Sequence, residues 1–152
     1  MTAIDAKFGH VNVTGRDWRS LAAFYTDVFG CEFVAPERDI RSADLDSATG
    51  LDDAHLTGAH LRLPGYGDGG PTLEIFQYDA IGPHPGTQVD RPGWGHVAFQ
   101  VPNVPAAVEA VVAAGGARFG DVVAMQTSDG RTVTWVYTTD PDGNLVELQA
   151  WS

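Results

Sequence analysis

Apolar and polar residues follow a helical period in two stretches, one in each half of the chain. In DWRSLAAFYTDVFG, residues 17–30, apolar side chains recur every three or four positions, which is the spacing of one helix face. Asp17 is a suitable N-cap and Gly30 a suitable C-terminal stop. In NVPAAVEAVVAAGG, Asn103 or the proline before it precedes the helical stretch, Pro105 lies in the first turn, and two glycines end it. We therefore predict one helix in each half.

Most other patterned stretches are predicted to be strands, because they are rich in β-branched and aromatic residues and are bounded by turn residues. The first half has CEFVAPE, AHLTGAHLRL and PTLEIFQY, and the second half has ARFGDVVAMQ, RTVTWVYTT and NLVELQAW. With one strand before each helix, each half is expected to have the order β-α-β-β-β. The predicted fold class is therefore α+β, built from two such modules.

Short motifs at a constant offset support a duplication. Phe8-Gly9-His10-Val11 aligns with Trp94-Gly95-His96-Val97, and the predicted N-caps and the terminal glycines of the two helices align at the same offset. DAIGPHPGTQVDRPG, between the halves, has the proline and glycine content of a linker. We predict a module over residues 1–78, a linker over 79–92 and a module over 93–152.

The first module is longer than the second, mainly in RDIRSADLDSATGLDDAH. This polar, acidic stretch has weak periodicity. It is interpreted either as a loop or short helix near the functional site, or as a surface insertion that the fold tolerates.

An acidic residue interrupts the apolar pattern in the last strand of each half. Glu74 lies between Leu73 and Ile75, and Glu147 lies between Val146 and Leu148. Because successive side chains of a strand point to opposite faces, each Glu is expected to point away from the face that packs on a helix.

A metal site is predicted from these glutamates together with the histidines of the first strands, His10 and His96. If the four strands curl into one trough, two imidazoles and two carboxylates converge, and a divalent cation offsets the cost of burying the carboxylates. Mixed nitrogen and oxygen ligands suit Zn²⁺, Ni²⁺, Fe²⁺, Mn²⁺ or Co²⁺. Taken singly, each His could be structural and each Glu could face solvent, but their repetition in both halves favours the metal site.

Composition narrows the class of partner. The 152 residues are 43% hydrophobic, which indicates a globular protein. The formal net charge of −11 argues against nucleic acid and anionic membranes as partners.

No apolar run approaches the ~18 residues of a membrane span. The start lacks a signal-peptide pattern, so we expect a cytoplasmic protein. The single cysteine, Cys31, excludes an intrachain disulfide and is interpreted as a core residue.

With these residues placed, the chain resembles the vicinal oxygen chelate superfamily, which includes glyoxalase I. Three motifs carry the resemblance: GHVNV entering a helix that ends FYTDVFG, GHVAFQV before the second helix, and TTDPDGNLVEL, which leads into the last strand and includes its start. It covers almost the whole chain. It implies a single domain over residues 1–152, in which two βαβββ modules form an open β-barrel trough around one metal ion. The implied ligands are His10, Glu74, His96 and Glu147.

The resemblance also implies a chemistry. We expect a metal-dependent lyase or isomerase of the glyoxalase I or epimerase type, acting on a small molecule with vicinal oxygens. A proton next to a metal-bound carbonyl would be removed through an enediolate or enolate. Glu147 is nominated as the base, with Glu74 as its partner on the opposite face, although both could be fixed ligands. The alternatives are an extradiol-type dioxygenase and a non-catalytic drug-binding or metabolite-binding protein. A homodimer is expected.

Weaker candidates surround the predicted site. His60 could face the trough as a second proton carrier, although a structural role is favoured. Arg62 or Arg131 could receive a substrate carboxylate or phosphate, although a surface charge is favoured for each. No cluster of basic residues suggests a glutathione site. A further group of aromatic residues could line an apolar pocket, although most should be core: Phe76, Tyr78, Phe99, Trp135 and Tyr137.

Overall fold

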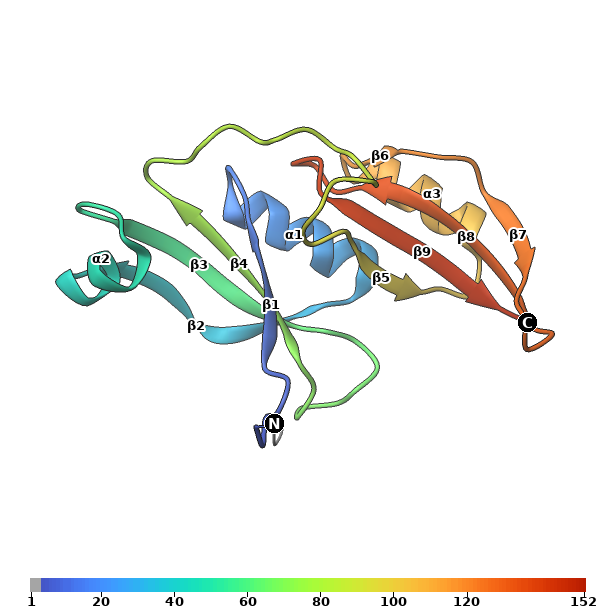
Figure 1. Ribbon diagram of the computed structural model, residues 1–152, viewed down its shortest axis with the longest axis horizontal. Helices are drawn as coiled ribbons and strands as arrows, with labels where there is room; N and C mark the ends of the chain where they lie inside the picture. Colours follow the sequence, from blue (N-terminus) through green and yellow to red (C-terminus); the bar gives the residue numbers. More distant parts are fainter. Residues whose placement is uncertain (1–3) are drawn as a thin grey trace. The chain divides into compact units, whose positions relative to one another are not determined.

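The structure is a computed structural model that describes residues 4–152. In this range the chain forms two β-sheets and three helices, which confirms the α+β class (Figure 1). The chain divides into two compact units, the first reaching Ile81 and the second containing Gly82–Ser152, with Asp27–Phe29 grouped with the second. Each sheet belongs to one unit.

The first unit has a four-stranded mixed sheet in the order β1-β4-β3-β2. The first strand runs parallel to the last, whereas the other pairs are antiparallel. The elements are β1 (His10–Thr14), α1 (Trp18–Phe29), β2 (Glu32–Arg41), α2 (Ala43–Thr49), β3 (His55–Arg62) and β4 (Thr72–Tyr78). This order makes the strand that begins with His10 the neighbour of the strand that carries Glu74.

The helix α1 begins and ends as the sequence predicts. The Asp17 carboxylate accepts hydrogen bonds from two amides of the first turn, and Gly30 adopts a φ of 69°, a left-handed conformation that glycine tolerates without steric cost. The Trp18 amide donates to the side-chain oxygen of Gln77 at 3.1 Å, which ties the start of the helix to β4.

The polar insertion of the first module contains the short helix α2, capped by Ser42. Residues 38–41, which we expected in the insertion, belong to β2, and this strand resumes its pairing with β3 after an irregularity between Val34 and Arg38. This end of β2 is an edge strand with mostly exposed side chains. An exposed edge needs no apolar alternation, so the sequence carried no strand signal there.

The second unit repeats this plan in the order β5-β9-β8-β6, with β7 also pairing with β8. Its elements are β5 (Val97–Gln100), α3 (Val104–Ala113), β6 (Ala117–Arg118), β7 (Val123–Gln126), β8 (Thr132–Thr139) and β9 (Leu145–Trp151). Asn103 caps α3 and Pro105 lies in its first turn, as predicted. The strand predicted over residues 117–126 is interrupted and forms β6 and β7, but both parts pair with β8.

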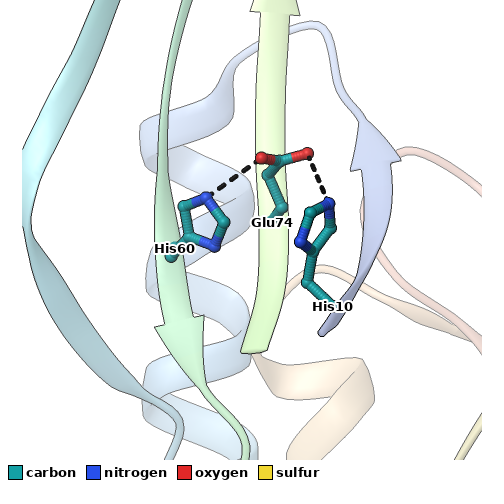
Figure 2. Close-up of side chains that lie close together, drawn as sticks. All are labelled: His10, His60 and Glu74. Carbon is teal, nitrogen blue, oxygen red and sulfur yellow. Dashed lines mark ion pairs between the residues drawn. The ribbon is translucent and has the colours of Figure 1, made fainter. Parts of the chain in front are cut away.

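Each sheet buries one face against its own helix. In Figure 2, α1 lies behind β3 and β4. The buried side chains of those strands include Ala59, Leu61, Leu73 and Ile75. In the second unit the buried side chains include Val136, Val146 and Leu148 of the sheet and Val104, Val108 and Val111 of α3. Within residues 4–152 no helix has the length and apolar character needed to cross a membrane.

Candidate metal centre

The two predicted carboxylates lie on the faces of their sheets that do not carry the helices. In β4, Leu73 and Ile75 are 2% and 0% exposed, while Glu74 alternates with them and is only half-buried. In β9, Glu147 alternates in the same way with the fully buried Val146 and Leu148. The alternation expected from the sequence is therefore confirmed for both residues.

Glu74 lies between two histidines from different strands (Figure 2). His60 Nε2 is 3.0 Å from Glu74 Oε1, and His10 Nε2 is 3.5 Å from Glu74 Oε2. One ligand atom from each of the three residues lies within 4.8 Å of the others. The rings of His10 and His60 are 5.4 Å apart and nearly perpendicular. Two imidazoles and a carboxylate thus form one cluster, which we call the first cluster.

The hydrogen bonds of His60 define its tautomer. A carboxylate oxygen only accepts, so the contact with Glu74 Oε1 requires a proton on Nε2. The other nitrogen, Nδ1, is 2.9 Å from the Thr72 hydroxyl, which can donate to it. Burial lowers the pKa of His60, and the attraction of the Glu74 charge opposes this shift only in part. In this arrangement a neutral His60 donates to Glu74.

Asn12 provides another contact to Glu74. Its side-chain amide donates to Glu74 Oε2 at 3.0 Å, and the two residues are direct partners in the parallel β1–β4 register. The Thr14 hydroxyl donates to the Asn12 side-chain oxygen at 3.3 Å, which leaves the NH₂ group directed at the carboxylate. Both oxygens of Glu74 therefore have partners, and its side chain is 13% exposed.

The second unit contains a smaller cluster of His96 and Glu147. His96 lies directly before β5, and its Nε2 is 3.0 Å from Glu147 Oε2. Their side chains are 34% and 18% exposed. We call this pair, with the adjacent Tyr137, the second cluster.

The turn that leads into β9 fixes where the strand that carries Glu147 begins. The Asp140 carboxylate is 1% exposed and accepts hydrogen bonds from the amides of Asp142 and Asn144 and from the Asn144 side chain. Gly143 has a φ of 92°, which a residue with a side chain rarely adopts. This turn lies within the TTDPDGNLVEL motif.

Tyr137 takes in the second unit the place that His60 takes in the first. In the antiparallel registers, His60 pairs with Glu74 and Tyr137 pairs with Glu147. The Tyr137 ring lies 5.0 Å from that of His96. Burial raises the pKa of Tyr137 and the charge of Glu147 raises it further, so the phenol keeps its proton at neutral pH.

The donor set of the first cluster fits a divalent transition metal. It offers imidazole nitrogens and a carboxylate oxygen, a mixture that suits Zn²⁺, Mn²⁺, Fe²⁺, Co²⁺ or Ni²⁺ better than an all-oxygen ion such as Ca²⁺. The Glu74 carboxylate also carries the outer hydrogen bonds that commonly orient ligating groups. His96 and Glu147 have the same chemistry in the second unit.

The structure brings the four predicted ligands together in pairs, His10 with Glu74 and His96 with Glu147. The convergence of all four on one ion stays a prediction. Asn12 was not predicted as a site residue, and the role predicted for His60 did not include its contact to Glu74. Only the cross-strand register identifies these two residues, and no spacing in the sequence signalled it.

The weaker candidates have other contacts. The Arg62 guanidinium bonds to the backbone oxygen of Asp68, and Arg131 pairs with Asp129 at 2.7 Å. Phe99 is a buried core residue at 8% exposure. The other four predicted pocket residues share the strand face of the glutamate in their own sheet and are half-buried: Phe76, Tyr78, Trp135 and Tyr137.

Comparison with known proteins identifies the family to which the chain is similar. Residues 7–148 match the family described as the Glyoxalase/Bleomycin resistance protein/Dioxygenase superfamily. Among curated proteins, none matches the chain.

Several solved structures share the fold at low sequence identity. A glyoxalase family protein from Bacillus cereus is 18% identical, with 99% of each chain covered and a TM-score of 0.82. A glyoxalase/dioxygenase from Nostoc punctiforme is 20% identical, over 99% of this chain and 97% of that one, with a TM-score of 0.65. The fosfomycin resistance protein FosX from Listeria monocytogenes, in complex with Mn(II) and sulfate, is 17% identical, over 97% and 93%, with a TM-score of 0.55.

Proposed function

Since this chain belongs to the Glyoxalase/Bleomycin resistance protein/Dioxygenase superfamily, we propose that it is a metal-dependent lyase or isomerase of the glyoxalase or epimerase type. The observation that supports this proposal most is the repetition of one His–Glu pair on the helix-free face of each sheet. We propose that His10, Glu74, His96 and Glu147 together hold one divalent cation. When bound, the cation would supply Lewis-acid stabilisation of negative charge on a substrate with two vicinal oxygens.

Glu147 is the proposed general base. Its ion-pair contact among residues 4–152 is with His96, and in this role it accepts a proton from a C–H bond next to a substrate carbonyl. The C–H electrons move into the substrate, and the proton on Glu147 is later returned to the same or the neighbouring carbon. The step consumes no oxidant or reductant. In the first cluster, Asn12 and His60 hold Glu74 in place.

The substrate is proposed to be a small molecule, bound on the helix-free sheet faces beside the two clusters. Half-buried aromatic side chains lie on those faces, Phe76 in the first unit and Trp135 in the second, and they can cover an apolar part of the substrate. We expect a homodimer, which size-exclusion chromatography with light scattering would test directly.

Metal retention tests the proposal. Purified protein is loaded separately with Ni²⁺, Co²⁺, Zn²⁺, Mn²⁺ or Fe²⁺, dialysed and measured by elemental analysis. We expect about one ion per chain in the wild type and a clear loss in His96→Ala and Glu147→Gln. His84→Ala is the matched control, because His84 lies outside both clusters. Retention in His96→Ala equal to that of the wild type would contradict the proposed site.

One observation favours a second candidate function. The first cluster has the two-histidine, one-carboxylate composition that non-haem Fe(II) oxygenases use. An extradiol-type dioxygenase would consume O₂ when the Fe²⁺-loaded protein receives a catechol, whereas an isomerase would exchange a substrate C–H proton with solvent without consuming O₂. A protein that retains no metal but binds small molecules would instead be a binding protein on the same fold.

A further inference from the structure

We propose that Asn12 is a positioning residue that fixes the Glu74 carboxylate, whereas among residues 4–152 no side chain takes the same role for Glu147. Asn12 holds the Glu74 carboxylate in one orientation, and Glu147 is held by fewer contacts. The assignment deepens the proposed function and rests on it.

Strand register identifies the equivalent positions in the two modules. In β1, His10 is followed two residues later by Asn12, which pairs with Glu74. In the second module, His96 is followed two residues later by Ala98, which pairs with Glu147. The two sheets therefore present the same His and the same Glu, but the residue beside the carboxylate differs. An amide in one module corresponds to a methyl group in the other.

The difference determines how many contacts each carboxylate has. Glu74 Oε2 accepts from the Asn12 amide at 3.0 Å and lies 3.5 Å from His10, and its Oε1 accepts from His60 at 3.0 Å. For Glu147, within residues 4–152, the ion-pair contact is with His96 alone, at 3.0 Å. Ala98 has no polar atom on its side chain, and Tyr137 is the register partner of Glu147 and senses its charge.

Contacts on both oxygens restrict the movement of a carboxylate. For Glu74 to rotate or withdraw, it must give up the Asn12 bond as well as the His60 bond, and both are charge-assisted. Thr14 holds the Asn12 amide in the donating orientation, which makes the restraint stiffer. Glu147 has to break only the contact with His96.

A pair of exchange variants tests this inference. Asn12→Ala copies the residue of the second module into the first, and Ala98→Asn makes the reverse change. The metal-free protein is labelled with a water-soluble carbodiimide and an amine, and the labelling rate of each glutamate is followed by peptide mass spectrometry. The exposed fractions of Glu74 and Glu147 are similar, 13% and 18%, so the comparison reports chiefly on restraint.

We expect Glu147 to be labelled several-fold faster than Glu74 in the wild type. Asn12→Ala should speed the labelling of Glu74 alone, and Ala98→Asn should slow the labelling of Glu147 alone. Thr14→Val should give a smaller change in the direction of Asn12→Ala, because the amide remains but loses its support. Equal labelling rates in the wild type, or no effect of Asn12→Ala on Glu74, would overturn the inference.

Affinity for Co²⁺ gives a second readout, followed by the visible absorption of the bound ion. Asn12→Ala should weaken binding by about 10- to 100-fold, as the loss of a hydrogen bond behind a ligand commonly does, whereas Ala98→Asn should not weaken it. Unchanged affinity and spectrum in Asn12→Ala would count against Asn12 as a positioning residue. If the wild type itself binds no Co²⁺, the proposed function fails, while the labelling rates still decide whether the two carboxylates differ.

Discussion

His60 donates to Glu74 across the β3–β4 pair, with 3.0 Å between Nε2 and Oε1. The bond joins the two most buried members of the first cluster, since their side chains are 17% and 13% exposed. A carboxylate that is held in this way is already oriented before any cation arrives. The register in which β3 and β4 pair is therefore expected to affect the metal affinity of the proposed site.

Removal of His60 should weaken metal binding without abolishing it. We expect His60→Ala to lower the affinity for Co²⁺ by about tenfold or more, because Glu74 loses the donor on one oxygen. Glu74→Gln should cost more, since it removes the anionic ligand itself. His55→Ala is the matched control, as His55 lies in the same strand and its partners are Asp39 and Asp79. Equal affinities in the wild type and His60→Ala would contradict this role.

Gly58 should not tolerate a side chain. A Cβ at this position would lie 2.1 Å from the backbone oxygen of Ile75 and 2.6 Å from the Phe76 ring, and the backbone cannot yield cheaply. We expect Gly58→Ala to lower the free energy of unfolding by about 1–3 kcal/mol or more, measured by urea denaturation. Gly9→Ala is the control, because a Cβ there meets nothing within 4 Å. A Gly58→Ala protein as stable as Gly9→Ala would show that the β3–β4 approach is looser than described.

His55 should make the stability of the first unit depend on pH. Its two ring nitrogens contact Asp39 at 2.7 Å and Asp79 at 3.0 Å, and both bonds require the protonated ring to donate twice. The hydrogen bond with Asp39, followed by that with Asp79, raises the pKa of His55 above 6.5. The contribution to stability is therefore complete below the unfolded-state pKa of about 6.5 and is lost as the pH rises through the folded-state value.

Urea denaturation at a series of pH values measures this effect. The wild type should lose stability relative to His55→Asn as the pH rises from about 5.5 to 8.5. His84→Asn, which leaves the pairs with Asp39 and Asp79 intact, should follow the wild type. A difference between the wild type and His55→Asn that stays constant over this range would count against the proposed protonation of the ring.

Cys31 should be unreactive in the folded protein. The residue is 1% exposed, and burial raises the pKa of its thiol to about 11, so little thiolate forms at neutral pH. We expect a disulfide reagent such as DTNB to titrate no thiol in the native protein and one in urea. Ala23→Cys places a thiol on the exposed side of α1 and should react at once in the native state. Rapid native labelling of Cys31 would mean that this core opens readily.

The sequence was informative where one residue type breaks a regular pattern. Glu74 stands out because it interrupts an apolar strand, and the structure confirms the face that this position implies. The starts of helices α1 and α3 were equally predictable, since Asp17 and Asn103 cap these helices by local hydrogen bonds. Such features depend on neighbours in the chain, and a linear sequence displays its neighbours directly.

The partners of Glu74 could not be predicted in the same way. Asn12 and His60 come from strands on either side of β4, and they meet the carboxylate only because of the register in which those strands pair. A shift of one residue would turn either side chain to the opposite face, and the sequence of each strand alone does not specify its pairing. The interruption between β6 and β7 was missed for a related reason, since residues 117–126 have the composition of one continuous strand.

The parallel pairing of the first and last strands of each module has a consequence for biosynthesis. β1 cannot complete its ladder until β4 has been made, so the sheet of the first unit closes late within its own module. All strand pairs of that sheet nevertheless lie within residues 10–78, before β5 begins. The first sheet can therefore form while the second unit is still being translated. Its strand edges are then exposed for a shorter time, which reduces the chance of aggregation.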